Sequence, residues 1–213
     1  MRFFSPKKYP MATRVLGFLL VPAVLVPLKS AAAGVPTDQI KVTVDKALLV
    51  LKDPRLKTAS NAKERRDQLK RILFARFDFP EMARRSLGSN WRRRTPKEQD
   101  EFVRLFTDLL ERAYSETIEA YTDEKILYIG EKLDGNYAEV KTKIITSKGQ
   151  EFTIDYKSHL IGKEWQVYDV VIENVSMVNN FRSQFNRVIN NDSYDELVRR
   201  LREKQTDASG SKK

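Results

Sequence analysis

The sequence of 213 residues contains no cysteine and a single histidine. Without cysteine the chain can form neither a disulfide scaffold nor a thiol nucleophile. The single histidine, His159, excludes most histidine-based metal sites and makes acid–base catalysis by histidine less favoured. No glycine-rich phosphate-binding loop and no cluster of metal ligands is found along the chain either. These absences argue against thiol-dependent, metal-dependent and phosphate-loop enzymes.

Long apolar runs are also missing. The longest, "VLGFLLVPAVLVPL" at 15–28, is shorter than the roughly 20 residues that a spanning helix needs, and prolines interrupt it. Basic residues precede this run, and the small residues Ala31 and Ala33 follow it. This order is typical of a cleavable secretory signal peptide over residues 1–33, so we expect an exported mature protein. An uncleaved membrane anchor is the alternative interpretation.

The charge is concentrated in the same segment. The whole chain carries 39 Lys and Arg against 29 Asp and Glu, a net charge of +10. Residues 1–33 hold five of the basic side chains and no acidic one, so the mature chain keeps 34 basic against 29 acidic side chains, or +5. A mildly basic exported domain favours contact with anionic surfaces and argues little for nucleic-acid binding.

Apolar residues recur at helical spacing on both sides of a central region. Thr95 and Glu98 form a predicted capping box with Pro96 at the first helical position, and Asp78 and Ser176 are predicted to cap two other helices. The predicted helices cover 37–52, 61–77, 80–87, 96–121, 177–190 and 194–205.

The central region alternates with a period of two, and turn signals divide it into strands over 125–133, 136–146, 150–160 and 164–173. Such short connections indicate an antiparallel meander. Helices, then strands, then helices predict an α+β fold with a single antiparallel four-stranded sheet packed against several helices. The domain is expected over 34–205, and the polar segment 206–213 is expected to be a disordered tail.

The fourth strand is apolar on both faces. Trp165, Val167 and Val171 alternate with Tyr168, Val170 and Ile172. An antiparallel sheet packed on one side usually has one polar face. Either helices cover the second face of this strand, or the sheet and the helices leave an apolar cavity between them.

Three polar residues are candidates for catalysis. Asp169, in an apolar strand, is either a general base with a perturbed pKa or a carboxylate satisfied by nearby backbone N–H groups or an arginine. His159 lies on the polar face of the third strand and is expected to be solvated. Ser176 has neither the flanking glycines of a nucleophile elbow nor a histidine partner. The sequence therefore favours a protein that is not an enzyme.

A basic cluster, Arg92, Arg93 and Arg94, follows Trp91. Stacking and phosphate contacts could suggest nucleic acid, but the predicted export argues against it. The remaining interpretations are a solvated loop, or a docking site for an acidic partner or for lipid head groups.

Two blocks of the chain carry a longer pattern. The first, 75–114, has Phe77-Asp78-Phe79, Met82-Ala83, Leu87-Gly88 and Trp91 before the helix that begins Thr-Pro. The second, 165–185, has Trp165, Val167-Tyr168-Asp169, Glu173 to Ser176, Arg182 and Phe185. Together they resemble the MlaC family of periplasmic phospholipid-binding proteins, also called the toluene-tolerance family. Asn174 stands where the family usually has glycine, and asparagine tolerates the left-handed conformation that such a turn needs.

The resemblance implies a soluble periplasmic carrier that shuttles a phospholipid between an outer-membrane lipoprotein–porin complex and an inner-membrane ABC transporter. This transport would maintain the lipid asymmetry of the outer membrane. It implies that the acyl chains lie in an apolar cavity between sheet and helices. No cofactor, metal or nucleic acid is implied, contact with membrane surfaces would be transient, and a monomer is expected. A hopanoid-transport protein of the same fold is the main alternative, and a periplasmic hydrolase or an adaptor is less favoured.

Side-chain phase along the predicted elements suggests which residues face the cavity. The predicted lipid-binding residues are Phe106, Leu109, Leu110, Ala113, Tyr128, Val140, Ile144, Ile154, Tyr156, Val167, Val175, Met177 and Phe181.

Overall fold

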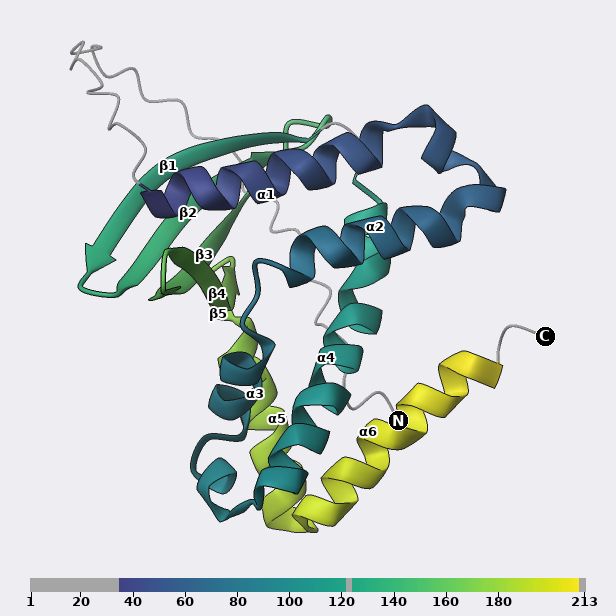
Figure 1. Ribbon diagram of the computed structural model, residues 1–213, viewed down its shortest axis with the longest axis vertical. Helices are drawn as coiled ribbons and strands as arrows, with labels where there is room; N and C mark the ends of the chain where they lie inside the picture. The colour runs from purple at the N-terminus through teal and green to yellow at the C-terminus, as the bar shows by residue number, and fades with distance from the viewer. Residues whose placement is uncertain (1–34, 122–123, 211–213) are drawn as a thin grey trace, which may run out of the picture.

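The computed structural model describes residues 35–121 and 124–210 (Figure 1). The predicted signal peptide over 1–33 lies outside the described residues. An antiparallel sheet lies at one end of the molecule with α1 running along it, and a bundle of helices occupies the other end (Figure 1). The order of helices, strands and helices confirms the α+β class.

A helical hairpin begins the described chain. Helix α1, Val35–Lys52, ends where Asp53 caps the short 3-10 helix η1, Pro54–Lys57, by accepting a hydrogen bond from the Arg55 N–H. A second 3-10 turn, η2, Ala59–Asn61, leads into α2, Ala62–Phe74. Proline restricts the residue before it to extended backbone, so the Asp53–Pro54 pair ends α1.

The bundle consists of α3, Phe79–Leu87; η3, Gly88–Arg93; α4, Pro96–Glu119; α5, Met177–Asn191; and α6, Tyr194–Gly210. The predicted caps are confirmed: the side chains of Asp78, Thr95 and Ser176 accept hydrogen bonds from backbone N–H groups three residues later. The bundle core is aromatic. The rings of Phe106 and Phe181 meet edge to face, with their centroids 5.4 Å apart. Helix α6 continues to Gly210, so the segment expected to be a disordered tail is helical over 206–210. Residues 206–210 contain no proline, and their single glycine is the last of them, so no helix breaker stops α6 before Gly210.

The sheet has five strands where four were expected. They are β1, Lys125–Asp134; β2, Tyr137–Ile145; β3, Glu151–Ile161; β4, Glu164–Ile172; and β5, Val175–Ser176, paired in that order and antiparallel. Glu173 and Asn174 have φ angles of 47° and 62°, and this tight turn returns the chain at once beside β4. Two residues are too few to show a period of two, which is why β5 was missed.

Strand β4 contains a β-bulge at Tyr168. Asp169 pairs with Lys157 and Val167 pairs with Ser158, so Tyr168 has no partner of its own on β3. A bulge of this kind shifts the alternation of side chains by one residue. Val167 before the bulge and Val170 after it therefore lie in the same apolar cluster, together with Ile40 of α1.

The segment between α2 and α3 attaches the helical hairpin to the edge of β4 that faces away from β3. The Val167 N–H donates to the Arg76 carbonyl at 2.8 Å, and the Asp78 N–H donates to the Val167 carbonyl at 2.9 Å. The Arg76 guanidinium then donates to Thr43 Oγ1 at 3.0 Å and Gln39 Oε1 at 2.9 Å, both on α1, and to the Trp165 carbonyl at 3.0 Å. One side chain thus connects α1 with β4.

Replacing this side chain should loosen α1. We expect Arg76→Met to lower the free energy of unfolding by about 2–4 kcal/mol, because it leaves buried acceptors without their charged donor. Hydrogen exchange should increase mainly along α1. Arg71→Met, on the exposed side of α2, is the control and should change stability by no more than about 0.5 kcal/mol. Equal effects of the two substitutions in denaturant unfolding would contradict this role for Arg76.

The turn before β5 gives a second prediction. Asn174 has a positive φ of 62°, which a β-branched residue adopts only with strain. Asn174→Val should cost about 1–2 kcal/mol of stability, whereas Asn174→Gly should stay within about 0.5 kcal/mol, because glycine relieves strain but is more flexible when unfolded. Thermal unfolding of both variants checks this, and a valine variant as stable as the glycine variant would count against it.

Candidate functional site

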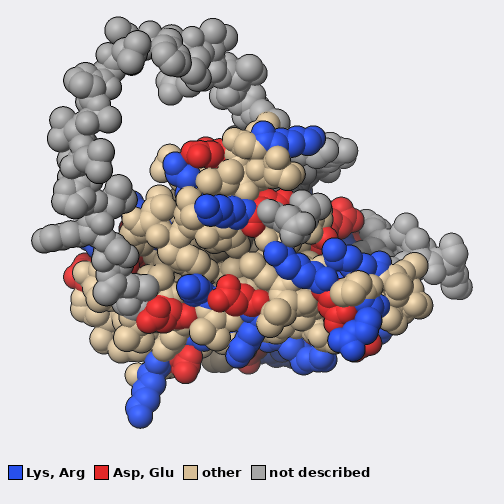
Figure 2. Space-filling view, turned by 90° about the horizontal axis from the view of Figure 1, so that it is seen from above, with Lys and Arg blue, Asp and Glu red and all other residues tan. Residues whose placement is uncertain are grey.

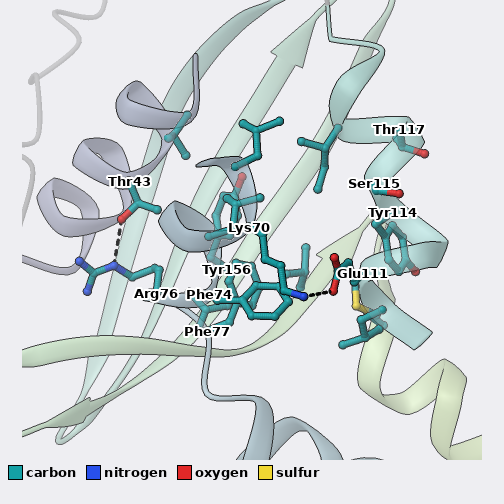
Figure 3. Close-up of a pocket in the computed structure, with 18 of the residues that line it drawn as sticks. Thr43, Lys70, Phe74, Arg76, Phe77, Glu111, Tyr114, Ser115, Thr117 and Tyr156 are labelled. Atoms are coloured by element: carbon teal, nitrogen blue, oxygen red, sulfur yellow. Dashed lines mark hydrogen bonds and ion pairs between the residues drawn. The ribbon is translucent and has the colours of Figure 1, made fainter. Parts of the chain in front are cut away.

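An apolar cavity of about 310 Å³ lies between the α1–α2 hairpin, α4 and the sheet. Its size falls at the lower end of the roughly 300–1,000 Å³ of ligand pockets. Figure 3 shows α1 on one side of the cavity, α4 on the other and the strands behind it. The expectation of an apolar space between sheet and helices is therefore confirmed.

Each wall of the cavity comes from a different part of the chain. Helix α1 contributes Ile40 and Val44, and α4 contributes Leu110, Tyr114 and Ile118. The rest of the apolar lining comes from α2, from the segment after it, from α3 and from α5. These residues are Leu69, Leu73, Phe74, Phe77, Phe79, Met82 and Met177. In most folds the apolar faces of such helices would pack together into a core. In this fold they surround the cavity.

The wall formed by the sheet depends on the bulge in β4. Val167, Val170 and Ile172 line the cavity from β4, and Ile154 and Tyr156 line it from β3. In a regular strand Val167 and Val170 would point to opposite faces. A switch of phase thus turns Val167, Val170 and Ile172, which the sequence placed on opposite faces of this strand, toward one cavity.

Tyr156 brings a hydroxyl group to this wall. Burial raises the pKa of Tyr156 to about 12, although a hydrogen bond with Thr142 acts in the opposite direction. Burial likewise raises the pKa of Tyr128, which packs near the same cluster. Both phenols are therefore neutral at physiological pH, and neither adds a charge to the apolar wall.

Charged residues are concentrated where α2 meets α4. Lys70 Nζ lies 2.6 Å from Glu111 Oε2, and Arg66 Nε lies 2.8 Å from Glu119 Oε1. Burial alone would raise the pKa of Glu119, but hydrogen bonds from Arg66 and Arg65 lower it overall. These ion pairs join α2 to α4 along the rim of the cavity, as the Lys70–Glu111 pair in Figure 3 shows.

The predicted lining residues divide into two groups. Those that line the cavity are Leu110, Ile154, Tyr156, Val167 and Met177. Phe106, Leu109 and Phe181 instead fill the core of the bundle, and Tyr128 and Val140 pack in the cluster that α1 covers. Ile144 is buried outside the cavity, Ala113 is half-buried on α4 away from it, and Val175 is 42% exposed.

Sequence reasoning missed the lining residues of the first two helices and of the second half of β4. Ile40, Val44, Leu69 and Leu73 did show a helical apolar stripe, which indicated burial but gave no sign of what each face would contact. Val170 and Ile172 were assigned to the wrong face because the bulge has no signature in the sequence.

The candidate catalytic residues have structural roles. Asp169, 5% exposed, accepts hydrogen bonds from Ser176 Oγ at 2.6 Å and from the Val178 N–H at 3.0 Å. The prediction that backbone N–H groups satisfy it is confirmed. His159 was expected to be solvated, and that prediction is wrong: its Nε2 lies 2.8 Å from Asp78 Oδ2, because the start of α3 packs against this face of β3. Neither residue lines the cavity.

The basic cluster lies away from the cavity. Arg92 and Arg93 are exposed in η3, in the segment that joins α3 to α4 at the end of the bundle opposite the sheet (Figure 1). Arg94 is held in place by Glu98 at 3.2 Å and by the ring of Tyr194 at 4.4 Å. Contact of this cluster with the head group of a lipid in the cavity does not fit this placement, whereas docking of Arg92 and Arg93 on a partner stays a prediction.

The described residues contain neither a membrane-spanning helix nor a metal-binding cluster. Within 35–121 and 124–210, no helix is long and apolar enough to cross a membrane. The same part of the chain holds no group of three or more His, Cys, Asp or Glu residues placed to bind a metal ion.

Comparisons with known proteins agree with this architecture. The chain is 28% identical over 169 residues to the toluene tolerance protein ttg2D of Pseudomonas putida, covering 78% of this chain and 79% of that protein. It is 26% identical over 122 residues to the intermembrane phospholipid transport system binding protein MlaC of Haemophilus influenzae, covering 55% of this chain and 57% of that protein.

A solved structure shares the fold. The phospholipid-binding protein of Ralstonia solanacearum, determined in complex with a phospholipid, matches with a TM-score of 0.73 at 23% sequence identity. The match covers 82% of this chain and 98% of that one. The family model described as "MlaC protein" matches residues 41–203, which include the cavity-lining segments of α2, α4, β3 and β4. The protein therefore belongs to the MlaC family.

Proposed function

We propose that this chain binds the acyl chains of a phospholipid in the cavity beneath the α1–α2 hairpin and carries the lipid through the periplasm. The observation that supports this most directly is the composition of the cavity wall. Its interior is built from aliphatic and aromatic side chains, and its charged residues lie at the rim, where α2 meets α4, and at the edge of β4. Such a lining suits hydrocarbon chains and offers little to a polar substrate.

The energetics of lipid transfer make a carrier necessary. Two acyl chains expose roughly 30 methylenes, and moving them into water costs on the order of 20 kcal/mol at about 0.8 kcal/mol each. Unassisted transfer through water is therefore slow. A cavity about as apolar as a bilayer interior removes most of this cost.

A carrier must also release its cargo. A wall of ordinary hydrophobic side chains, without many polar anchors, gives affinity close to that of the membrane itself, so the lipid can leave as readily as it enters. The charged groups in this cavity wall largely pair with one another, as Lys70 does with Glu111 and Arg66 with Glu119. This arrangement therefore favours reversible lipid binding over tight, permanent binding.

The proposed route runs between an outer-membrane lipoprotein–porin complex and an inner-membrane ABC transporter, as family membership suggests. The name of the Haemophilus influenzae relative, an intermembrane phospholipid transport system binding protein, supports this route. The predicted signal peptide would deliver the chain to the periplasm. Arg92 and Arg93, exposed at the far end of the bundle, are proposed to contact an acidic partner during docking.

A hopanoid carrier of the same fold remains the second candidate, because an apolar wall also accepts a polycyclic lipid. Native mass spectrometry of protein purified from its own host separates the two by the mass of the bound lipid. A hydrolase would instead require a reactive group at the cavity, but Asp169 and His159 are both engaged elsewhere in hydrogen bonds.

A charged side chain in the cavity should abolish lipid binding. Ile154 lines the cavity from β3, whereas Ile161, on the same strand, is 51% exposed. We expect Ile154→Glu to purify without bound phospholipid, because a carboxylate in contact with the acyl chains carries a large desolvation cost. Far-UV circular dichroism should remain close to that of the unmodified protein. Native mass spectrometry measures the bound lipid.

The matched control is Ile161→Glu, which places the same charge on the same strand at the surface. It should retain lipid. If Ile154→Glu keeps its lipid, or if both variants lose it while staying folded, the cavity is not the site that holds the acyl chains. Protein from its native host that never carries lipid would reject the proposed function itself.

A further inference from the structure

Three cations line the cavity within the described part of the chain, and they differ in how firmly the protein holds them. Arg76 donates to two residues of α1 and to a backbone carbonyl of β4. Arg66 is 42% exposed, and it pairs with Glu119, which is 14% exposed and also pairs with Arg65. Lys70 forms one ion pair within the described residues, with Glu111, and its side chain is 42% exposed. Lys70 is as exposed as Arg66, but its partner Glu111 is 24% exposed, against 14% for Glu119, so Lys70 is the cation that can exchange its partner most easily.

Lys70 also lies at the boundary between the apolar cavity and solvent. Its ammonium group is 5.2 Å from the centroid of the Phe74 ring, which lines the cavity. In Figure 3 its side chain extends from α2 across the rim to Glu111 on α4. A lipid with its chains among the apolar residues must place the first polar group above those chains at such a boundary.

We propose that the Lys70 ammonium binds the phosphate of the lipid whose chains occupy the cavity, and that Glu111 weakens this contact by competing for the same cation. The inference rests on the proposed function. A phosphodiester is ionised at neutral pH and presents unprotonated oxygens, and the ammonium group has three N–H donors. Lys70 can therefore keep a hydrogen bond to Glu111 while it donates another to the phosphate.

Glu111 gives the contact a moderate strength. An unpaired ammonium at a partly desolvated rim would attract the phosphate strongly, and release would be slow. With Glu111 2.6 Å away, the pair is neutral as a whole, and the phosphate gains only part of the charge-assisted interaction. Affinity for the phosphate is thus set by two opposed side chains on different helices.

This arrangement selects lipids by their phosphate. A diacylglycerol has the same chains but no phosphate, and it gains nothing from Lys70. The same holds for an uncharged polycyclic lipid. Phospholipids are therefore favoured over neutral lipids of equal apolar surface, and the preference resides in a charged residue at the rim of the cavity.

The test uses delipidated full-length mature protein and vesicles that contain either dioleoylphosphatidylglycerol or dioleoylglycerol in a background of digalactosyldiacylglycerol, a bilayer-forming lipid without phosphate. Lys70→Gln should weaken binding of phosphatidylglycerol by about twofold to fivefold, the range expected for a partly exposed charge pair. Binding of dioleoylglycerol should not change. Glu111→Gln should act in the opposite direction and tighten phosphatidylglycerol binding by about twofold to fivefold.

The control variant is Lys63→Gln. Lys63 lies on the same helix, is 89% exposed and pairs with Asp67 outside the cavity. It should leave both affinities unchanged, and Lys70→Arg should retain most of the phosphatidylglycerol affinity. Added salt should weaken phosphatidylglycerol binding to the unmodified protein more than binding to Lys70→Gln, because screening acts on the charge contact.

Several results would overturn the inference. If Lys70→Gln lost affinity for both lipids equally, the role of Lys70 would be to hold α2 against α4. If Lys63→Gln lost as much affinity as Lys70→Gln, the effect would come from overall charge. Displacement of bound phosphatidylglycerol by inorganic phosphate at matched concentration would show that Lys70 binds free phosphate instead. If the unmodified protein binds neither lipid, the proposed function fails, whereas lipid binding that is indifferent to Lys70 and Glu111 rejects only the role of this pair.

Discussion

The β-bulge at Tyr168 is the constraint on which the rest of the structure depends. By adding one residue to β4, it turns Val167, Val170 and Ile172 toward a single face and makes that face a continuous apolar wall. The same irregularity leaves Asp169 directed at the start of α5, where it accepts hydrogen bonds from Ser176 and Val178. One unpaired residue thus sets both the wall of the cavity and the attachment of the bundle to the sheet.

A cavity persists because the helices around it are held by polar contacts as well as by packing. Arg76 fixes α1 against β4, and ion pairs across the rim fix α2 against α4. Apolar side chains alone would lower the free energy by packing together and closing the space.

The face viewed from above in Figure 2 shows basic and acidic side chains interspersed with uncharged ones, so charge on that face does not gather into a patch of one sign.

Much of the fold was predictable because its signals are local. The capping box at Thr95, the caps at Asp78 and Ser176 and the turn at Asn174 depend on residues within a few positions of one another. The lining was less predictable. Leu110 and Ile154 were correctly assigned, but Phe106 and Phe181 were not, because a helical stripe looks the same whether it meets another helix or a cavity.

The sequence by itself determined the class of fold, the order and type of the main elements and, through two blocks of residues, the family to which the chain belongs. Only the tertiary structure decided which apolar residues remain uncovered by other side chains, where the bulge reverses the phase of β4 and which cation reaches the rim. Helical and strand periodicity report that a side chain is buried, since burial alone sets the pattern. What it is buried against depends on segments far apart in the chain, and their relative positions are fixed only when the whole domain has folded.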